Sequence, residues 1–212
     1  MTLRIFSRRL LVAVGVAGIL LGSSAPVFAG GVEKLKASVD KAIEILKDPE
    51  LGKPERTDER RGLLREALYG QFDFHKMSEA AVGRNWRDFS PPQKERFIQL
   101  FKALLENAYL DKIERYQGEQ IDFVREVDVS PSLKTVDSQV LAKGRKLKLS
   151  YRLHETGDGW RVFDVLVEGV SVVANYRAQF NQLLRSGSVD ELLSRLEEKA
   201  RAGESEKAKG SD

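Results

Sequence analysis

One carboxylate is a candidate for proton transfer. Asp164 lies in the segment WRVFDVLV, among Val, Phe and Leu residues. Burial in such a strand would raise the pKa of the carboxyl and suit it to general acid or base work, as in small cone-shaped α+β isomerases. The alternative, which we favour, is a structural ion pair with Arg177 on the following helix.

Other reactive residues do not form a catalytic pattern. His75 and His154 are the only histidines, and they fall in different predicted elements without a second ligand at metal spacing. We therefore expect His75 to be half-exposed and His154, at a strand end beside a hairpin, to lie at the surface. No serine nucleophile or phosphate-binding loop is recognisable. The sequence predicts no catalytic residue, no metal site and no cofactor.

The stretch around Asp164 organises the rest of the chain. Residues 160–167 alternate as a strand that is apolar on both faces, so something must cover each face. Gly169 is the expected hinge, because glycine tolerates the backbone angles of a sharp turn. Ser171 then caps a predicted helix with one apolar side.

Helices precede strands along the chain, which predicts an α+β fold. N-terminal helices should pack on a C-terminal antiparallel meander of four strands, with a large apolar cavity between them. The predicted helices are 32–47, 58–69, a short segment within 72–82, 92–116 and, after the strands, one following Ser171 and a short one at 189–196. The predicted strands are 121–129, 135–142, 146–153 and 160–167.

The longest helix, 92–116, is apolar over about half its circumference. A surface helix needs an apolar stripe only about 100° wide. The excess predicts either packing on two sides or one wall of a cavity, and the sequence alone favours packing.

The two ends of the chain differ in composition from its centre. Residues 1–29 carry three arginines and an apolar run before Val27-Phe28-Ala29, which predicts a signal peptide cleaved after Ala29. Residues 30–198 would then form one domain, and residues 199–212, charged and poor in apolar residues, a disordered tail. With no cysteine, the chain has neither disulfides nor a lipid-attachment site. We therefore expect a soluble, monomeric periplasmic protein.

The charge balance gives no support for nucleic-acid binding. The chain has 35 basic and 32 acidic residues, and its net charge of +3 comes entirely from the three arginines of the predicted signal peptide. The remainder is balanced, whereas a nucleic-acid-binding protein needs a basic face.

Several blocks of residues resemble the MlaC family of periplasmic phospholipid-binding proteins, also called toluene-tolerance auxiliary components of an ABC transporter. The resemblance covers essentially the whole chain after the signal peptide. The most specific block is WRVFDVLVEGVSVVANYRAQF. The supporting residues are Phe72-Asp73-Phe74, Met77, Gly83, Trp86, Phe97, Phe101, Leu104, Leu105 and Tyr116-Gln117-Gly118-Glu119.

This resemblance implies a carrier rather than an enzyme. It would shuttle phospholipids between an inner-membrane ABC complex, with its lipid-binding ring protein, and an outer-membrane lipoprotein–porin complex, and so maintain outer-membrane lipid asymmetry. The carrier needs a cavity, and a two-chain lipid calls for ~1,000 Å³, the upper end of ordinary pockets. Two other classes stay open: an enzyme that uses Asp164, and an adaptor that binds proteins and no lipid.

For the long helix 92–116, the resemblance favours the second alternative. We therefore expect this helix to form one wall of the cavity and the sheet to form the other. Since no basic cluster is evident for deep phosphate binding, we expect the headgroup near the mouth and weak headgroup selectivity. The residues predicted to line the cavity are Phe97, Leu100, Phe101, Leu104, Ala108, Leu149, Tyr151, Phe163, Val165 and Tyr176.

Overall fold

The computed structural model describes residues 31–142 and 144–209. The predicted signal peptide, residues 1–29, lies outside the described residues. This part of the chain has six α-helices and two short 3-10 helices, of which all but the last two α-helices precede the strands. In chain order the helices are α1 (Gly31–Lys47), η1 (Pro54–Arg56), α2 (Thr57–Tyr69), α3 (Phe74–Val82), η2 (Gly83–Asp88), α4 (Pro91–Glu114), α5 (Val172–Ser186) and α6 (Val189–Lys209).

The strands form one antiparallel sheet in chain order, which confirms the predicted α+β fold and meander. They are β1 (Gln120–Ser130), β2 (Leu133–Ala142), β3 (Arg145–Thr156), β4 (Gly159–Val167) and β5 (Val170–Ser171). The sheet has five strands rather than the predicted four, because the chain turns back after β4 and adds two residues. Glu168 and Gly169 make that turn with φ angles of 50° and 81°, so the predicted hinge at Gly169 is confirmed.

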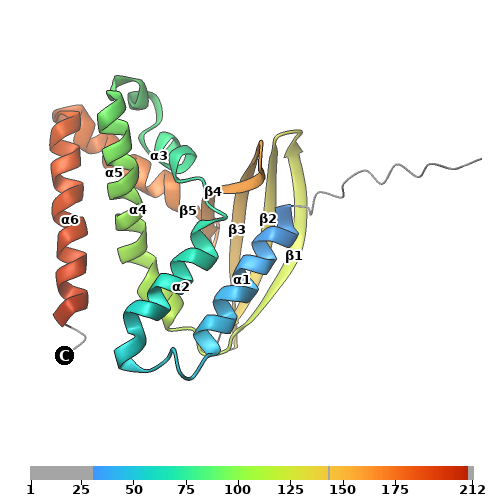
Figure 1. The fold of residues 1–212 in the computed structure, drawn as a ribbon. Helices are drawn as coiled ribbons and strands as arrows, with labels where there is room; N and C mark the ends of the chain where they lie inside the picture. The colour runs from blue at the N-terminus through green and yellow to red at the C-terminus, as the bar shows by residue number, and fades with distance from the viewer. Residues whose placement is uncertain (1–30, 143, 210–212) are drawn as a thin grey trace, which may run out of the picture.

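Helices cover one face of the sheet. Figure 1 shows α1 lying along the sheet with α2 beside it, while α4 and α6 form the pair farthest from the sheet. Helices α3 and α5 lie between that pair and the end of β4. In the described part of the chain, the other face of the sheet carries no helix, and its side chains include the Arg125–Asp137 ion pair at 2.7 Å.

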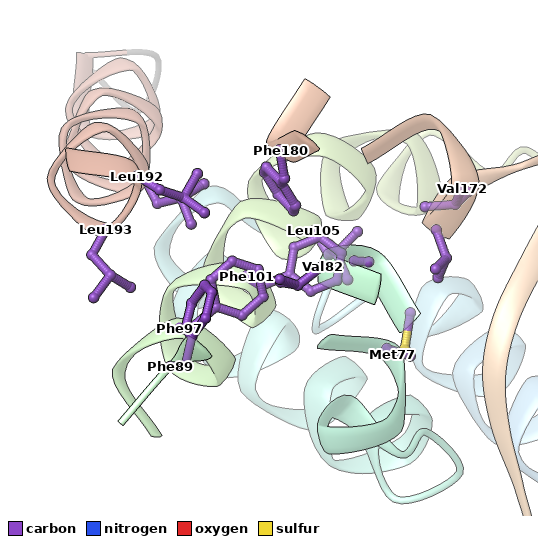
Figure 2. Close-up of a cluster of buried hydrophobic side chains, with 13 residues drawn as sticks. Met77, Val82, Phe89, Phe97, Phe101, Leu105, Val172, Phe180, Leu192 and Leu193 are labelled. Atoms are coloured by element: carbon purple, nitrogen blue, oxygen red, sulfur yellow. The ribbon is translucent and has the colours of Figure 1, made fainter. Parts of the chain in front are cut away.

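The largest hydrophobic core is built mainly from α3, α4, α5 and α6, and Phe163 and Val165 of β4 pack against it. Phe97 and Phe101 of α4 are both fully buried at its centre (Figure 2). They meet Phe180 of α5 edge to face, with ring centroids 5.4 and 5.6 Å apart. Leu192 and Leu193 of α6 close the other side. These aromatic contacts fix α4, which also contributes to the functional site described below.

Helix α4 begins at Pro91, one residue before the predicted start. Ser90 and Gln93 form a reciprocal capping box, and proline occupies the first turn, where its missing N–H has no intrahelical partner to lose. The helix ends at Glu114, two residues before the predicted end.

Helix α6 corrects the prediction for the C-terminus. It runs from Val189 to Lys209, so residues 199–209 are helical where a disordered tail was expected. Ala200 is buried, and the Asn107 side chain of α4 donates a hydrogen bond to its carbonyl at 3.1 Å. A segment rich in Lys, Glu and Ala has a composition found in disordered chains, but the same residues are strong helix formers. Leu192, Leu193 and Leu196 at the start of α6 are buried in the hydrophobic core, and the helix continues from them to Lys209.

Candidate functional site

An apolar cavity of about 500 Å³ lies between the helix-covered face of the sheet and helices α1, α2 and α4. Its walls are mainly aliphatic and aromatic side chains from segments far apart in the sequence. The sheet contributes Ile121, Val140, Leu147, Leu149, Tyr151, Val165 and Val167, and α1 contributes Leu35, Val39, Ala42, Ile43 and Leu46. The α2–α3 region contributes Leu64, Leu68, Tyr69, Phe72, Phe74 and Met77, and α4 contributes Leu105, Glu106, Tyr109, Leu110, Lys112 and Ile113. Arg115, Tyr116, Glu119 and Val172 complete the lining.

Strand register places the sheet residues on one face. Leu149 of β3 lies opposite Val167 of β4, and Tyr151 lies opposite Val165. Side chains alternate between the faces of a strand, so every second residue of β3 from Leu147 points toward the helices. Directly opposed residues lie on the same face, which extends this apolar surface across the neighbouring strands.

Helix α4 uses two different faces. Its first half buries Phe97 and Phe101 in the hydrophobic core, whereas its second half presents Tyr109 and Ile113 to the cavity. Both alternatives for its wide apolar surface are therefore correct, in different turns of the helix. The position of the change could not be read from periodicity, which identifies a face and not what that face contacts.

Three of the ten residues predicted to line the cavity do so: Leu149, Tyr151 and Val165. Phe97 and Phe101 are fully buried core residues instead. Leu100, Leu104, Phe163 and Tyr176 pack against the same core, and Ala108 is partly buried outside the lining. The contribution of α1 was not predicted, although its apolar stripe is visible in the sequence, because a single apolar stripe does not identify the element that it faces.

Ion pairs fasten α2 to α4 beside the cavity. Arg61 approaches Glu114 to 2.8 Å and Asp111 to 3.2 Å, and Arg60 approaches Glu114 to 3.3 Å. One turn along, Arg65 pairs with Glu106 at 2.6 Å. Burial alone would raise the pKa of Glu114, but hydrogen bonds from Arg61 and the two nearby guanidinium charges outweigh it and hold that pKa below its usual value.

Replacing Glu114 with glutamine should destabilise the protein at neutral pH. The Glu114 side chain is only 9% exposed, so the change leaves the largely buried Arg60 without its counter-charge and leaves Arg61 with Asp111 alone. We expect a loss of about 2 to 3 kcal/mol in the free energy of unfolding at pH 7. Because the folded-state pKa of Glu114 is lowered, its contribution is present above the unfolded value near 4.3 and is lost as pH falls through the folded value.

Urea unfolding from pH 7 to pH 3 measures this contribution. The difference between Glu114→Gln and the unmodified protein should be largest at neutral pH and should shrink below about pH 4. A Glu55→Gln variant, changed in the exposed helix η1, provides the surface control. A Glu114→Gln difference that stays constant over this pH range would contradict the assignment.

Asp164 has structural partners on three sides, but Arg177 is not one of them. Its carboxylate accepts hydrogen bonds from the Ser171 hydroxyl at 2.7 Å and the Val173 backbone N–H at 3.1 Å. Its arginine partner is Arg152, at 3.4 Å. Arg177 instead donates to the Ala80 carbonyl at 2.6 Å. The predicted pair is therefore wrong in its partner, because the β4–β5 turn brings Asp164 to the start of α5 and beside β3.

The two histidines differ in their surroundings. His154 Nε2 lies 2.9 Å from Asp73 Oδ2, which links β3 to the start of α3, so the expectation of a surface position is wrong for this residue. His75 is exposed and its ring meets Trp86 edge to face. Within residues 31–142 and 144–209, no three metal-binding side chains gather at one place.

The cavity suits hydrocarbon better than polar chemistry. Asp164 does not belong to its lining, and the pKa of the lining residue Tyr69 is raised by burial and by Glu106, which disfavours ionisation of its hydroxyl. Apolar walls on four sides match a ligand with a long apolar part. No helix in the described part of the chain is both long and apolar enough to cross a bilayer.

Comparison with known proteins agrees with this geometry. The family described as "MlaC protein" matches residues 36–198. The chain belongs to the MlaC family. The match begins within α1 and ends within α6, so it includes every wall of the cavity.

Two individual proteins are informative. The chain is 20% identical over 145 residues to the intermembrane phospholipid transport system binding protein MlaC of Haemophilus influenzae, covering 66% of this chain and 68% of that protein. It also resembles the solved structure of a phospholipid-binding protein from Ralstonia solanacearum in complex with a phospholipid, with a TM-score of 0.73 and 24% identity. That match covers 82% of this chain and 99% of the solved one, and at this identity it establishes the fold.

Proposed function

We propose that this member of the MlaC family is a periplasmic phospholipid carrier. It would exchange lipid with an inner-membrane ABC complex and its lipid-binding ring protein, and with an outer-membrane lipoprotein–porin complex, and so maintain outer-membrane lipid asymmetry. The observation that carries the proposal is the apolar cavity lined by the sheet, α1, α2 and α4.

Physical chemistry gives the reason for a closed carrier. Keeping two acyl chains of ~16 carbons out of water is worth roughly 25 kcal/mol, at about 0.8 kcal/mol per methylene. A protein that moves such a lipid through an aqueous compartment must therefore supply apolar walls. The family match and the phospholipid named for both relatives support phospholipid as the cargo.

The volume of the cavity limits how much lipid it can hold without a change in shape. At about 500 Å³ it is half of the ~1,000 Å³ expected for a two-chain lipid, although it lies within the ordinary range for small-molecule sites. In this proposal the walls separate when two chains enter. Helices α1 and α2 are the proposed moving part, because they pack on each other and line the cavity opposite the sheet. The ion pairs of Arg60, Arg61 and Arg65 with α4 would oppose the movement of α2.

Native mass spectrometry of the purified protein lacking residues 1–29 tests this proposal. We expect added mass equal to one or more diacyl phospholipids, with the same lipids recovered by solvent extraction. A protein that carries no lipid and takes none up from phospholipid vesicles would contradict the carrier function. That result would favour the protein-binding adaptor instead.

A further inference from the structure

The C-terminal end of α4, with the residue that follows it, brings two positive side chains to the cavity. Lys112 and Arg115 both belong to its lining, and both are exposed, so they lie where the cavity meets solvent. Residues three apart on a helix lie on the same face, about 5–6 Å apart at Cβ. The two cations can therefore reach one ligand group.

Most neighbouring acids are already paired with arginines of α2. Glu106, which also lines the cavity, is paired with Arg65 at 2.6 Å, and Glu114 is paired with Arg61 at 2.8 Å. Glu119 is the other acid of the lining, and its carboxylate accepts the Gln117 backbone N–H at 2.6 Å. With Glu106 compensated, the rim keeps an excess of positive charge.

The two cations keep their own donors available. Across residues 31–142 and 144–209, neither Lys112 nor Arg115 has an acidic side chain within 4 Å. The Lys112 ammonium lies 4.8 Å from the centroid of the Tyr109 ring, a contact that leaves its N–H groups unused. Cations near a helix C-terminus also complement the helix dipole. A cation that only complements the dipole would not need to contact the cavity, but Lys112 and Arg115 both line it.

We propose that Lys112 and Arg115 form an anion subsite at the cavity rim that binds the phosphate group of the lipid while its acyl chains occupy the cavity. This inference rests on the proposed carrier function and adds the chemical group that is recognised. A guanidinium donates to two phosphate oxygens at once, and an ammonium adds a point charge. Since every glycerophospholipid carries this phosphate, the subsite separates phospholipids from uncharged diacylglycerols and tolerates different headgroups.

The test compares two lipids with identical acyl chains. Delipidated protein is incubated with an equimolar mixture of dioleoyl phosphatidylglycerol and dioleoylglycerol, and the bound ratio is read by native mass spectrometry. We expect a preference of about tenfold for phosphatidylglycerol, the scale of one charge-assisted contact. The Lys112→Gln, Arg115→Gln double variant should lose this preference and bind diacylglycerol as the unmodified protein does.

A matched control variant has the same change in net charge at a different place on α4. Lys94→Gln with Arg96→Gln removes one lysine and one arginine from the other end of α4, away from the cavity lining, and should retain the full preference. An equal loss in both double variants would overturn the subsite, and so would equal binding of the two lipids by the unmodified protein. Failure to bind either lipid would instead overturn the carrier function.

Inorganic phosphate separates the lipid from a free anion. If the subsite binds phosphate as part of a lipid, millimolar inorganic phosphate should not displace bound phosphatidylglycerol, because inorganic phosphate has no acyl chains to occupy the cavity. Displacement at that concentration would show a site for free anions and would overturn the proposal.

Discussion

Replacing Asp164 with alanine should cost about 3 to 5 kcal/mol of folding stability, the range for removing one partner of a buried charge network. The Asp164 side chain is 3% exposed and holds the Ser171 hydroxyl, the Val173 N–H and Arg152 together. Without it, a buried backbone donor at the start of α5 has no acceptor. The corner that joins β4, β5 and α5 would lose its central contact.

Urea unfolding followed by tryptophan fluorescence measures this loss, with Trp160 reporting from the start of β4. Asp128→Ala is the control, since Asp128 is 79% exposed and pairs with Lys134 at 3.5 Å. It should change stability by less than about 1 kcal/mol. An unaltered unfolding midpoint for Asp164→Ala would contradict the structural role and return attention to the enzyme alternative.

Filling the cavity from the sheet side should abolish lipid loading while leaving the fold intact. Leu149 is half-buried in the cavity wall at the centre of β3, so Leu149→Trp directs a larger ring into the space. Excluding only two methylenes from burial costs about 1.6 kcal/mol, more than a factor of ten in affinity. We therefore expect at least a tenfold drop in bound phospholipid, measured by extraction from the purified variant.

Leu141→Trp provides the matched control. Leu141 lies on β2, is 44% exposed and does not belong to the cavity lining. The same change at that position should leave the lipid content unaltered. Both variants should keep the circular dichroism spectrum of the unmodified protein. If the Leu149→Trp protein carries as much lipid as the unmodified protein, the cavity is not the site where lipid binds.

Local sequence patterns predicted the helices and strands well, but they predicted less well which elements pack against each other. The period of two in β3 identified the face of Leu149 and Tyr151, and the sheet is antiparallel with consecutive strands adjacent, so that face could be assigned. Helix α4 has no such constraint. Phe97 and Tyr109 are both aromatic residues of its apolar side, yet Phe97 is fully buried in the core and Tyr109 lines the cavity, because different elements pack against the two positions.

Charge partners were harder to predict than apolar faces. Arg177 follows Asp164 closely in the chain, but the side chain that reaches the carboxylate belongs to Arg152 on the adjacent strand. The pairing of Asp73 with His154 joins residues 81 positions apart. Such contacts depend on strand register and a single hinge, and neither is visible in the spacing of charged residues.

The cavity walls also affect how the protein folds. They join side chains from Leu35 in α1 to Val172 at the start of α5, so no early fragment of the chain can enclose the space. Contacts between such distant segments form slowly, because the chain must first lose the entropy of closing long loops. The helical core around Phe97 also draws on residues from α3 to α6. The cavity is therefore completed late in folding, only when α1 docks on a sheet that begins 73 residues after the helix ends.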